Sequence, residues 1–87
     1  GSPMIETEYS VYDKKAKLYN PPFVASNDDV ALRLAGQIFQ SSKMFSEHPH
    51  DFVVIKICTF DNSTGEVKDL APEVLCEFAD FLNPPEE

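Results

Sequence analysis

FVVIKICTF, residues 52–60, is the stretch of sequence that decides the fold. Its run of β-branched and aromatic side chains predicts a β-strand, and its nearly continuous apolar character indicates a central place in a sheet. The polar residues 61–65 then predict a hairpin loop in which Gly65 takes a left-handed conformation. Residues 66–70 are expected to return as the partner strand.

In residues 5–12, β-branched and aromatic side chains recur at every second position, which predicts a half-buried strand. The polar residues 13–17 predict a turn, and Leu18 and Tyr19 begin a second extended piece. Pro21 and Pro22 keep the chain extended, because each proline fixes φ and moves its predecessor out of the helical region. The residues expected on one side of the first strand are Ile5, Thr7, Tyr9 and Val11.

Residues 26–40 predict an amphipathic helix. Ser26 or Asn27 can cap its free N–H groups, and the two aspartates that follow suit the positive end of the helix dipole. An apolar stripe at helical spacing is expected to pack against the sheet. The stripe comprises Val30, Ala31, Leu34, Ala35 and Ile38.

Residues 73–82 carry apolar side chains at a spacing that fits a short helix, and Pro72 suits a first helical turn. We expect a helix there, with a strand as the alternative. The chain is therefore predicted to be α+β: a small antiparallel sheet in the order β-β-α-β-β-α, with one main amphipathic helix packed on it. One domain is expected over residues 4–83, after a tag remnant at residues 1–3 and before an acidic disordered tail at residues 84–87.

The net charge is −8 over 87 residues. Residues 1–60 hold six basic and seven acidic side chains, whereas residues 61–87 hold one basic and eight acidic. This balance excludes simple binding of a phosphate backbone by the molecule as a whole, because counterion release needs clustered Lys and Arg. No apolar run approaches the ~20 residues of a membrane helix, so we expect no membrane association and a cytosolic protein.

Residues that carry chemistry are few. Residues 48–51 could supply metal ligands, but Pro49 blocks the helical spacing that zinc ligands use. No second Cys/His pair stands at a metal-like spacing elsewhere in the sequence. Residues 61–65 resemble the start of a calcium loop, but Pro72 stands where the bidentate acid belongs. Cys58 and Cys76 lie in apolar runs and are interpreted as core residues. We therefore expect no catalytic residue, no metal and no cofactor, and a protein that acts by binding.

One segment interleaves aromatic and basic side chains. Aromatic rings stack unpaired bases and lysines contact the backbone, so this segment is the candidate surface for single-stranded nucleic acid. The alternative is that Tyr9 and Phe23 belong to the core while the lysines only make a turn soluble. The segment comprises Tyr9, Tyr12, Lys14, Lys15, Lys17, Tyr19 and Phe23.

Five short pieces of the chain, in order and spacing, resemble the small non-structural protein of gokushovirus-type microviruses, which are single-stranded DNA bacteriophages. The resemblance covers about two-thirds of the chain. The pieces are Tyr9-Ser-Val-Tyr12-Asp13, then Pro21-Pro22-Phe23, then Asn27-Asp28 with Ala31 and Arg33, then His48-Pro49-x-Asp51-Phe52, and Phe60-Asp61-x-x-Thr64-Gly65.

The resemblance implies a phage protein of the bacterial host cytoplasm that is absent from the mature capsid. It also implies a binding role in viral single-stranded DNA synthesis or packaging, with a phage or host replication or packaging protein as partner. If the resemblance holds, the residues expected to touch DNA are Tyr12, Lys14, Lys15, Lys17 and Tyr19. Within the same pattern, residues 48–52 are expected to form a structural joint in which Asp51 bonds the loop backbone and Phe52 fills the core, with a partner-recognition loop as the alternative.

Two further hypotheses stay open. In the first, the acidic third binds a basic host or phage protein, in the manner of a DNA mimic and without nucleic-acid binding, through Glu73, Glu77 and Asp80. In the second, the chain forms a homodimer through the apolar side chains of its C-terminal segment. Those side chains are Val74, Leu75, Phe78, Phe81 and Leu82.

Overall fold

The computed structural model describes residues 5–82, so the predicted tag remnant and acidic tail lie outside the described residues. The predicted α+β class is confirmed: five antiparallel strands form one sheet in the order β2-β1-β4-β5, and β3 pairs with a second stretch of β1. The elements are β1 (Ile5–Asp13), β2 (Leu18–Tyr19), β3 (Phe23–Ala25), α1 (Asp28–Ser41), α2 (Lys43–Glu47), β4 (Phe52–Asp61) and β5 (Val67–Glu77), with 3₁₀ turns η1 (Pro49–Asp51) and η2 (Phe78–Phe81).

Strand β4 takes the central place that its apolar run predicts. It pairs with β1 along one edge and with β5 along the other. The turn after β4 is closed by the Gly65 N–H, which donates to the Asp61 carbonyl at 2.7 Å. Gly65 has a φ of +80°, the left-handed conformation expected there.

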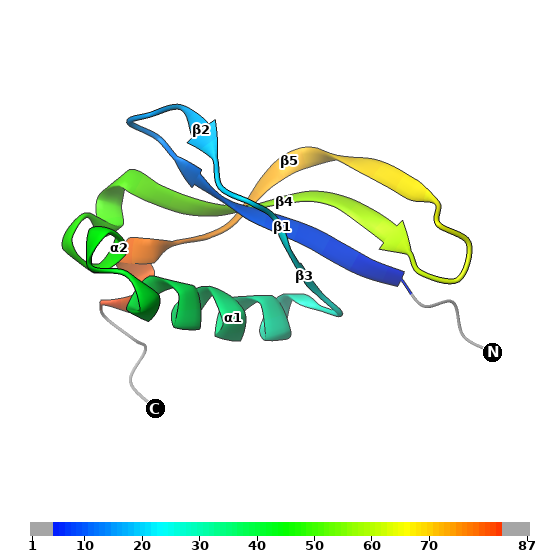
Figure 1. The fold of residues 1–87 in the computed structure, drawn as a ribbon, viewed down its shortest axis with the longest axis horizontal. Helices are drawn as coiled ribbons and strands as arrows, with labels where there is room; N and C mark the ends of the chain where they lie inside the picture. Colours follow the sequence, from blue (N-terminus) through cyan, green and yellow to red (C-terminus); the bar gives the residue numbers. More distant parts are fainter. Residues whose placement is uncertain (1–4, 83–87) are drawn as a thin grey trace.

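Helix α1 begins where the sequence predicts. The Asn27 side chain accepts from the Val30 N–H at 2.9 Å and caps the helix. The buried line of the helix is Ala31, Ala35 and Phe39, while the larger side chains of the predicted stripe flank it and are partly buried. Figure 1 shows α1 running along one side of the sheet, beneath β1 and β4.

The predicted C-terminal helix is wrong over most of its length. Strand β5 continues through Pro72 to Glu77, and only the single 3₁₀ turn η2 follows. Pro72 is tolerated because β5 is an edge strand. The pairing of β4 with β5 shifts register at two places, between Val54 and Ile55 and between Lys56 and Cys58. Each shift breaks the alternation of side chains, so the period of two that marks a strand is lost from the sequence.

The core between α1 and the sheet is centred on Phe78, which is fully buried. Its ring lies 5.5 Å from that of Phe39 in α1, 5.1 Å from that of Phe45 in α2 and 5.9 Å from that of Phe52 in β4. One residue of η2 therefore joins both helices and the central strand. The expected core role of Phe52 is confirmed, since it is 2 % exposed.

The loop before β4 forms the structural joint that was expected, but through the backbone of Asp51. Its N–H donates to the His48 carbonyl at 3.1 Å, and its carbonyl accepts from the Lys14 N–H at 2.8 Å. The Asp51 carboxylate instead lies 3.8 Å from the Lys15 Nζ. The joint therefore ties the turn after β1 to the start of β4.

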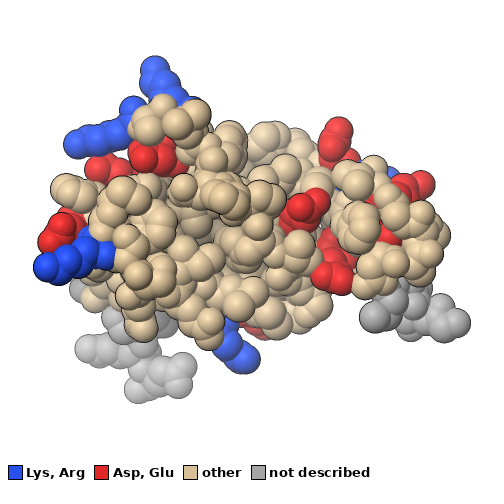
Figure 2. All heavy atoms as spheres, viewed as in Figure 1, with Lys and Arg blue, Asp and Glu red and all other residues tan. Residues whose placement is uncertain are grey.

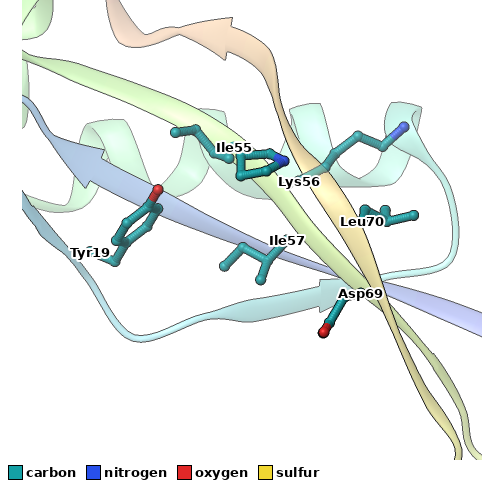
Figure 3. A pocket seen from close by; sticks show the side chains of 7 residues that line it. Tyr19, Ile55, Lys56, Ile57, Asp69 and Leu70 are labelled. Atoms are coloured by element: carbon teal, nitrogen blue, oxygen red, sulfur yellow. The ribbon is translucent and has the colours of Figure 1, made fainter.

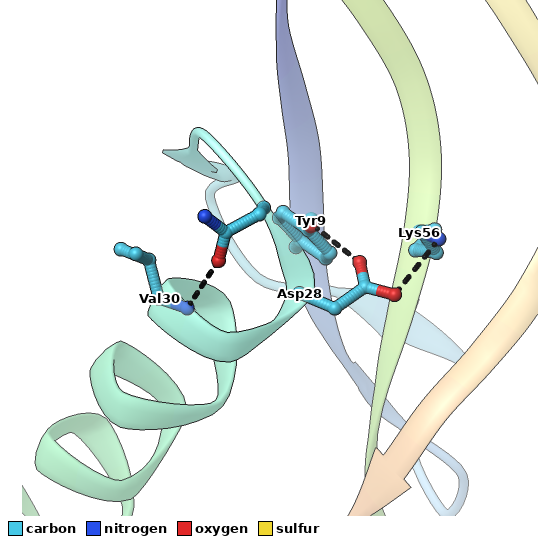
Figure 4. Close-up of polar contacts among 5 residues, drawn as sticks. Tyr9, Asp28, Val30 and Lys56 are labelled. Atoms are coloured by element: carbon cyan, nitrogen blue, oxygen red, sulfur yellow. Dashed lines mark hydrogen bonds and ion pairs between the residues drawn. The ribbon is translucent and has the colours of Figure 1, made fainter.

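A polar junction fastens the start of α1 to the sheet (Figure 4). The buried Tyr9 hydroxyl donates to Asp28 Oδ1 at 2.8 Å, and Lys56 Nζ lies 3.2 Å from Asp28 Oδ2. The hydrogen bond from Tyr9 and the contact with Lys56 lower the pKa of Asp28. Burial and the same aspartate raise the pKa of Tyr9 to about 12. Strands β1 and β4 thus hold the helix N-terminus through one carboxylate.

Phe78→Ala is expected to lower the free energy of unfolding by about 3–5 kcal/mol, because it empties the centre of the aromatic core. That is a large part of the total for a domain of this size. Leu82→Ala is the control, since Leu82 is 48 % exposed and its loss changes stability by less than about 0.5 kcal/mol. Urea denaturation followed by circular dichroism measures both; equal effects of the two substitutions would contradict this packing.

Asp28→Asn is expected to be less stable than the wild type at neutral pH, by up to about 1 kcal/mol because the ion pair is half exposed. A carboxyl whose pKa is lower in the folded state stabilises the fold above its unfolded pKa of about 3.9, and this contribution is lost as the pH falls through the folded pKa. The difference between the two proteins should therefore shrink below about pH 4.

Denaturant midpoints at a series of pH values measure this difference. Asp29→Asn is the matched control, because Asp29 is the neighbouring exposed residue in the same first helical turn. A difference for Asp28→Asn that stays constant down to about pH 2 contradicts the junction as described.

Candidate functional site

The face of the sheet that points away from α1 is open. Strand register places Tyr12, Val53 and Glu77 in one row across β1, β4 and β5, and Ser10, Ile55 and Val74 in the next. No helix of the described residues covers this face, and Figure 3 shows α1 behind the sheet from this side. The β4 run is apolar on both faces, so this open surface is apolar too.

The tyrosines predicted to stack bases lie side by side on this face. Tyr12 near the end of β1 is paired in register with Tyr19 in β2, and their ring centroids are 4.7 Å apart. Tyr19 is 53 % exposed, whereas Tyr12 is half-buried. The third tyrosine, Tyr9, points to the other face and belongs to the core. Two of the three tyrosines are therefore available to a ligand.

The three predicted lysines lie in the turn that joins β1 to β2, and all three are exposed. The Asp13 carboxylate accepts from the N–H groups of Lys15 and Ala16 at 2.9 and 3.0 Å, which fixes the turn. Lys17 has a φ of +59°, in the left-handed region that disfavours a side chain with Cβ. The turn therefore holds a lysine at a position where glycine would be less strained.

Carboxylates approach two of these lysines. Lys14 Nζ lies 3.6 Å from Glu77 Oε1, and Lys15 Nζ lies 3.8 Å from Asp51 Oδ2. Lys17 makes no ion pair among residues 5–82. Exposed pairs at such distances contribute little stability and are easily exchanged for another anion. The turn therefore keeps mobile cationic groups, although its net charge is reduced.

A groove on the open face was not foreseen from the sequence. It has a volume of about 370 Å³ and lies between Tyr19 and strand β5. Figure 3 shows Tyr19, Ile57 and Asp69 directed to the same side of the sheet. The signal in the sequence was the β4 run itself, because one main helix covers only one of its two apolar faces. The lining residues are Tyr19, Ile55, Lys56, Ile57, Asp69, Leu70 and Pro72.

The three residues of the predicted acidic partner site, Glu73, Glu77 and Asp80, have different surroundings. Glu77 and Asp80 form a reciprocal cap on η2, in which the Glu77 N–H donates to Asp80 Oδ2 at 3.0 Å. Glu77 also contacts Lys14 at the cationic turn, whereas Glu73 lies opposite Lys56 along β5. Two of the three acids therefore have local structural partners.

Acidic side chains gather instead at the opposite end of the molecule, around the β4–β5 hairpin. Figure 2 shows this separation along the long axis: blue side chains project at the upper left and red ones dominate the right. Lys68 is the basic residue among them. The acids on β1 and on the hairpin are Glu6, Glu8, Asp61, Glu66 and Asp69.

The cysteines occupy the structural positions that were expected. Cys58 is buried and its Sγ donates to Glu8 Oε2 at 3.0 Å. This hydrogen bond, together with burial, raises the pKa of the Cys58 thiol to about 11. Burial raises the pKa of the Cys76 thiol to about 11 as well, helped by nearby carboxylates. Both thiols therefore stay protonated at neutral pH and are poor nucleophiles.

The predicted dimer interface is not one surface. Val74 is 57 % exposed on the open face, whereas Leu75 and Phe81 pack against the core and Phe78 is its centre. The C-terminal apolar residues thus serve mainly the interior of their own chain. A homodimer stays a prediction, but the segment supplies only Val74 and Leu82 as exposed apolar side chains.

No group of three or more His, Cys, Asp or Glu side chains within residues 5–82 is arranged to hold a metal ion. Over the same residues, none of the helices combines the length and the apolar character needed to span a bilayer.

The chain matches a family model described as Phage ORF5 protein over residues 7–81, which covers every strand and helix named above except the first two residues of β1. No curated protein and no solved structure matches the chain. A match over this much of the sequence establishes the family, and the chain belongs to the Phage ORF5 protein family.

Proposed function

We propose that this phage protein is a non-enzymatic adaptor in viral single-stranded DNA synthesis or packaging, which contacts single-stranded DNA weakly through its open face. The observation that carries the proposal is the Tyr12–Tyr19 ring pair, 4.7 Å apart, beside a turn that holds three exposed lysines. A base stacks on the exposed face of Tyr19 while Lys14, Lys15 and Lys17 contact the flanking phosphates. The Tyr12 ring packs beside Tyr19 at an interplanar angle of 48°.

The strained backbone at Lys17 favours a role for its side chain. A non-glycine residue in the left-handed region costs about 1 kcal/mol, and such strain is retained most often where the residue serves a function. The structure of the turn alone is better served by glycine.

The net charge of −8 limits the strength of the proposed contact with DNA. Because the acidic hairpin lies at the far end, a strand bound at the turn runs along β2 and away from most of the carboxylates. Only about three phosphates are neutralised by the three lysines, so binding is weak and depends on stacking. Weak contact suits an adaptor that is held on DNA partly by a phage or host replication or packaging protein.

The resemblance of five short pieces of the chain to the non-structural protein of gokushovirus-type microviruses supports the same role. Under this proposal the protein acts in the cytoplasm of the infected bacterium and stays outside the mature capsid. Membership of the Phage ORF5 family is in keeping with a phage origin.

Tyr19→Ala is expected to weaken binding of a single-stranded oligonucleotide about tenfold, because it removes the exposed stacking surface. Substituting Lys14, Lys15 and Lys17 together by Ala should lower affinity and reduce the salt slope by about 2, since each phosphate contact contributes about 0.7. Fluorescence anisotropy with a labelled oligonucleotide of about 12 nucleotides, across a salt series, measures both effects.

Two controls separate binding from folding. Arg33→Ala removes one positive charge from an exposed position on α1, away from the open face, and should leave affinity unchanged. Lys17→Gly relieves the left-handed backbone, so it should be at least as stable as the wild type while binding DNA less tightly. Absence of oligonucleotide binding at low salt, or equal losses in Arg33→Ala and Tyr19→Ala, rules out this DNA interface.

A second candidate function is supported by the acidic end of the molecule. Five carboxylates around the β4–β5 hairpin, with Lys68 as the basic residue among them, present an anionic surface to a basic protein. Complementary charge of this kind accelerates encounter and sets partner choice. In this version the protein is an interaction module or DNA mimic and needs no nucleic acid.

The double substitution Glu6→Gln with Glu66→Gln is expected to release a basic partner that wild-type protein retains from a lysate of phage-infected cells. Pull-down with quantitative mass spectrometry measures the retention. Glu73→Gln is the control, because it removes one charge at mid-strand in β5 outside the acidic end. A partner lost equally from both variants, or retained by both, argues against the acidic end as its binding surface.

A further inference from the structure

The groove on the open face has two unlike walls. On one side stands the exposed aromatic ring of Tyr19, and on the other lie Leu70 and Pro72 of the edge strand β5. Its floor is Ile55 and Ile57 from the central strand, and Ile55 is only 8 % exposed. An apolar floor beside an exposed aromatic ring offers a stacking surface to a flat ring.

The size of the groove limits the ligand. Its volume of about 370 Å³ is close to the lower bound of roughly 300 Å³ for small-molecule sites. It is too small for a folded partner and suits one flat ring with its attached sugar. A nucleobase meets both conditions, since its faces stack on an aromatic side chain and its edges carry polar groups.

Two charged residues line the groove. Lys56 is paired with Asp28 at the start of α1, so Asp69 is the charged group that gives the groove a preference. Asp69 lies on its rim, makes no ion pair among residues 5–82, and its carboxylate can only accept hydrogen bonds. The strand register places Asp69 beside Cys58, whose buried thiol already donates to Glu8. The edge of a bound ring that reaches Asp69 is therefore stabilised when it presents an N–H donor.

We infer that this groove is a subsite for a single unpaired cytosine, because its small volume favours the smaller pyrimidine ring and cytosine is the DNA pyrimidine that carries an exocyclic amino group. The inference rests on the proposed contact with single-stranded DNA and names the part of the strand that is recognised. Tyr19 stacks the ring, Leu70 and Pro72 close its other side, and Asp69 accepts from the cytosine N4 amino group. Thymine presents a carbonyl oxygen at the same position, which a carboxylate repels.

The charge distribution fits this orientation of the strand. The cationic turn of residues 14–17 leads directly into Tyr19, so the phosphates lie at the lysine end of the groove. The carboxylate of Asp69 comes from β5, on the far side of the groove floor. Phosphate and base are thus each directed to the end of the site with the complementary group.

The test compares oligo-dC with oligo-dT of equal length, about 12 nucleotides, by fluorescence anisotropy at low salt. Wild-type protein should bind oligo-dC about tenfold more tightly than oligo-dT, because one hydrogen bond to a charged acceptor is gained. Asp69→Asn should bring the two affinities within about twofold, since an amide both donates and accepts. Glu66→Gln carries the same change of charge in the same hairpin, outside the groove, and should keep the preference.

The outcomes separate the subsite from the proposed function. If both oligonucleotides bind but with equal affinity, or if Asp69→Asn keeps the preference for oligo-dC, the subsite is wrong while DNA contact stands. If neither oligonucleotide binds, the subsite and the proposed DNA contact are both wrong.

A second copy of the chain is the rival occupant of this groove, and sedimentation velocity across a concentration series tests it. We expect a monomer at the concentrations used for binding. A concentration-dependent dimer that Tyr19→Ala and Leu70→Ala both abolish would assign the groove to a second copy and overturn the inference.

Discussion

Burial of Phe78 is the constraint on which the rest of this structure depends. The chain is short and has one long helix, so a single layer of helix must cover the sheet. Phe78 enters that layer from the end of β5 and contacts aromatic rings of α1, α2 and β4. The bulky apolar side chains that α1 can cover lie on one side of the sheet, and no helix of residues 5–82 covers the second face.

The open face is the consequence that bears on function. A central strand that is apolar on both sides normally lies between two layers, yet no helix of residues 5–82 covers the side on which Ile55 and Ile57 line the groove. An apolar floor, an exposed aromatic ring and a cationic turn are thus brought together by the lack of a second helical layer. The proposals made for this Phage ORF5 family member all begin from that geometry.

Charge separation along the molecule follows from the same topology. The β1–β2 turn and the β4–β5 hairpin lie at opposite ends of the sheet, and they carry the lysines and many of the carboxylates respectively (Figure 2). The separation is incomplete, because Glu77 and Asp51 lie beside Lys14 and Lys15. These two carboxylates reduce the positive charge of the turn. Base stacking is therefore the main source of affinity in the proposed DNA contact.

The sequence by itself determined the α+β class, the central place of β4, the cap at Asn27 and the left-handed Gly65, because each depends on neighbouring residues and on local periodicity. It placed Tyr12 and Tyr19 with the turn lysines for the same reason. Only the tertiary structure decided that residues 73–77 are strand, since register shifts against β4 hide the alternation. It alone brought Asp69 and Leu70 to the groove beside Tyr19, because that meeting depends on pairing between strands fifty residues apart, which no local pattern records.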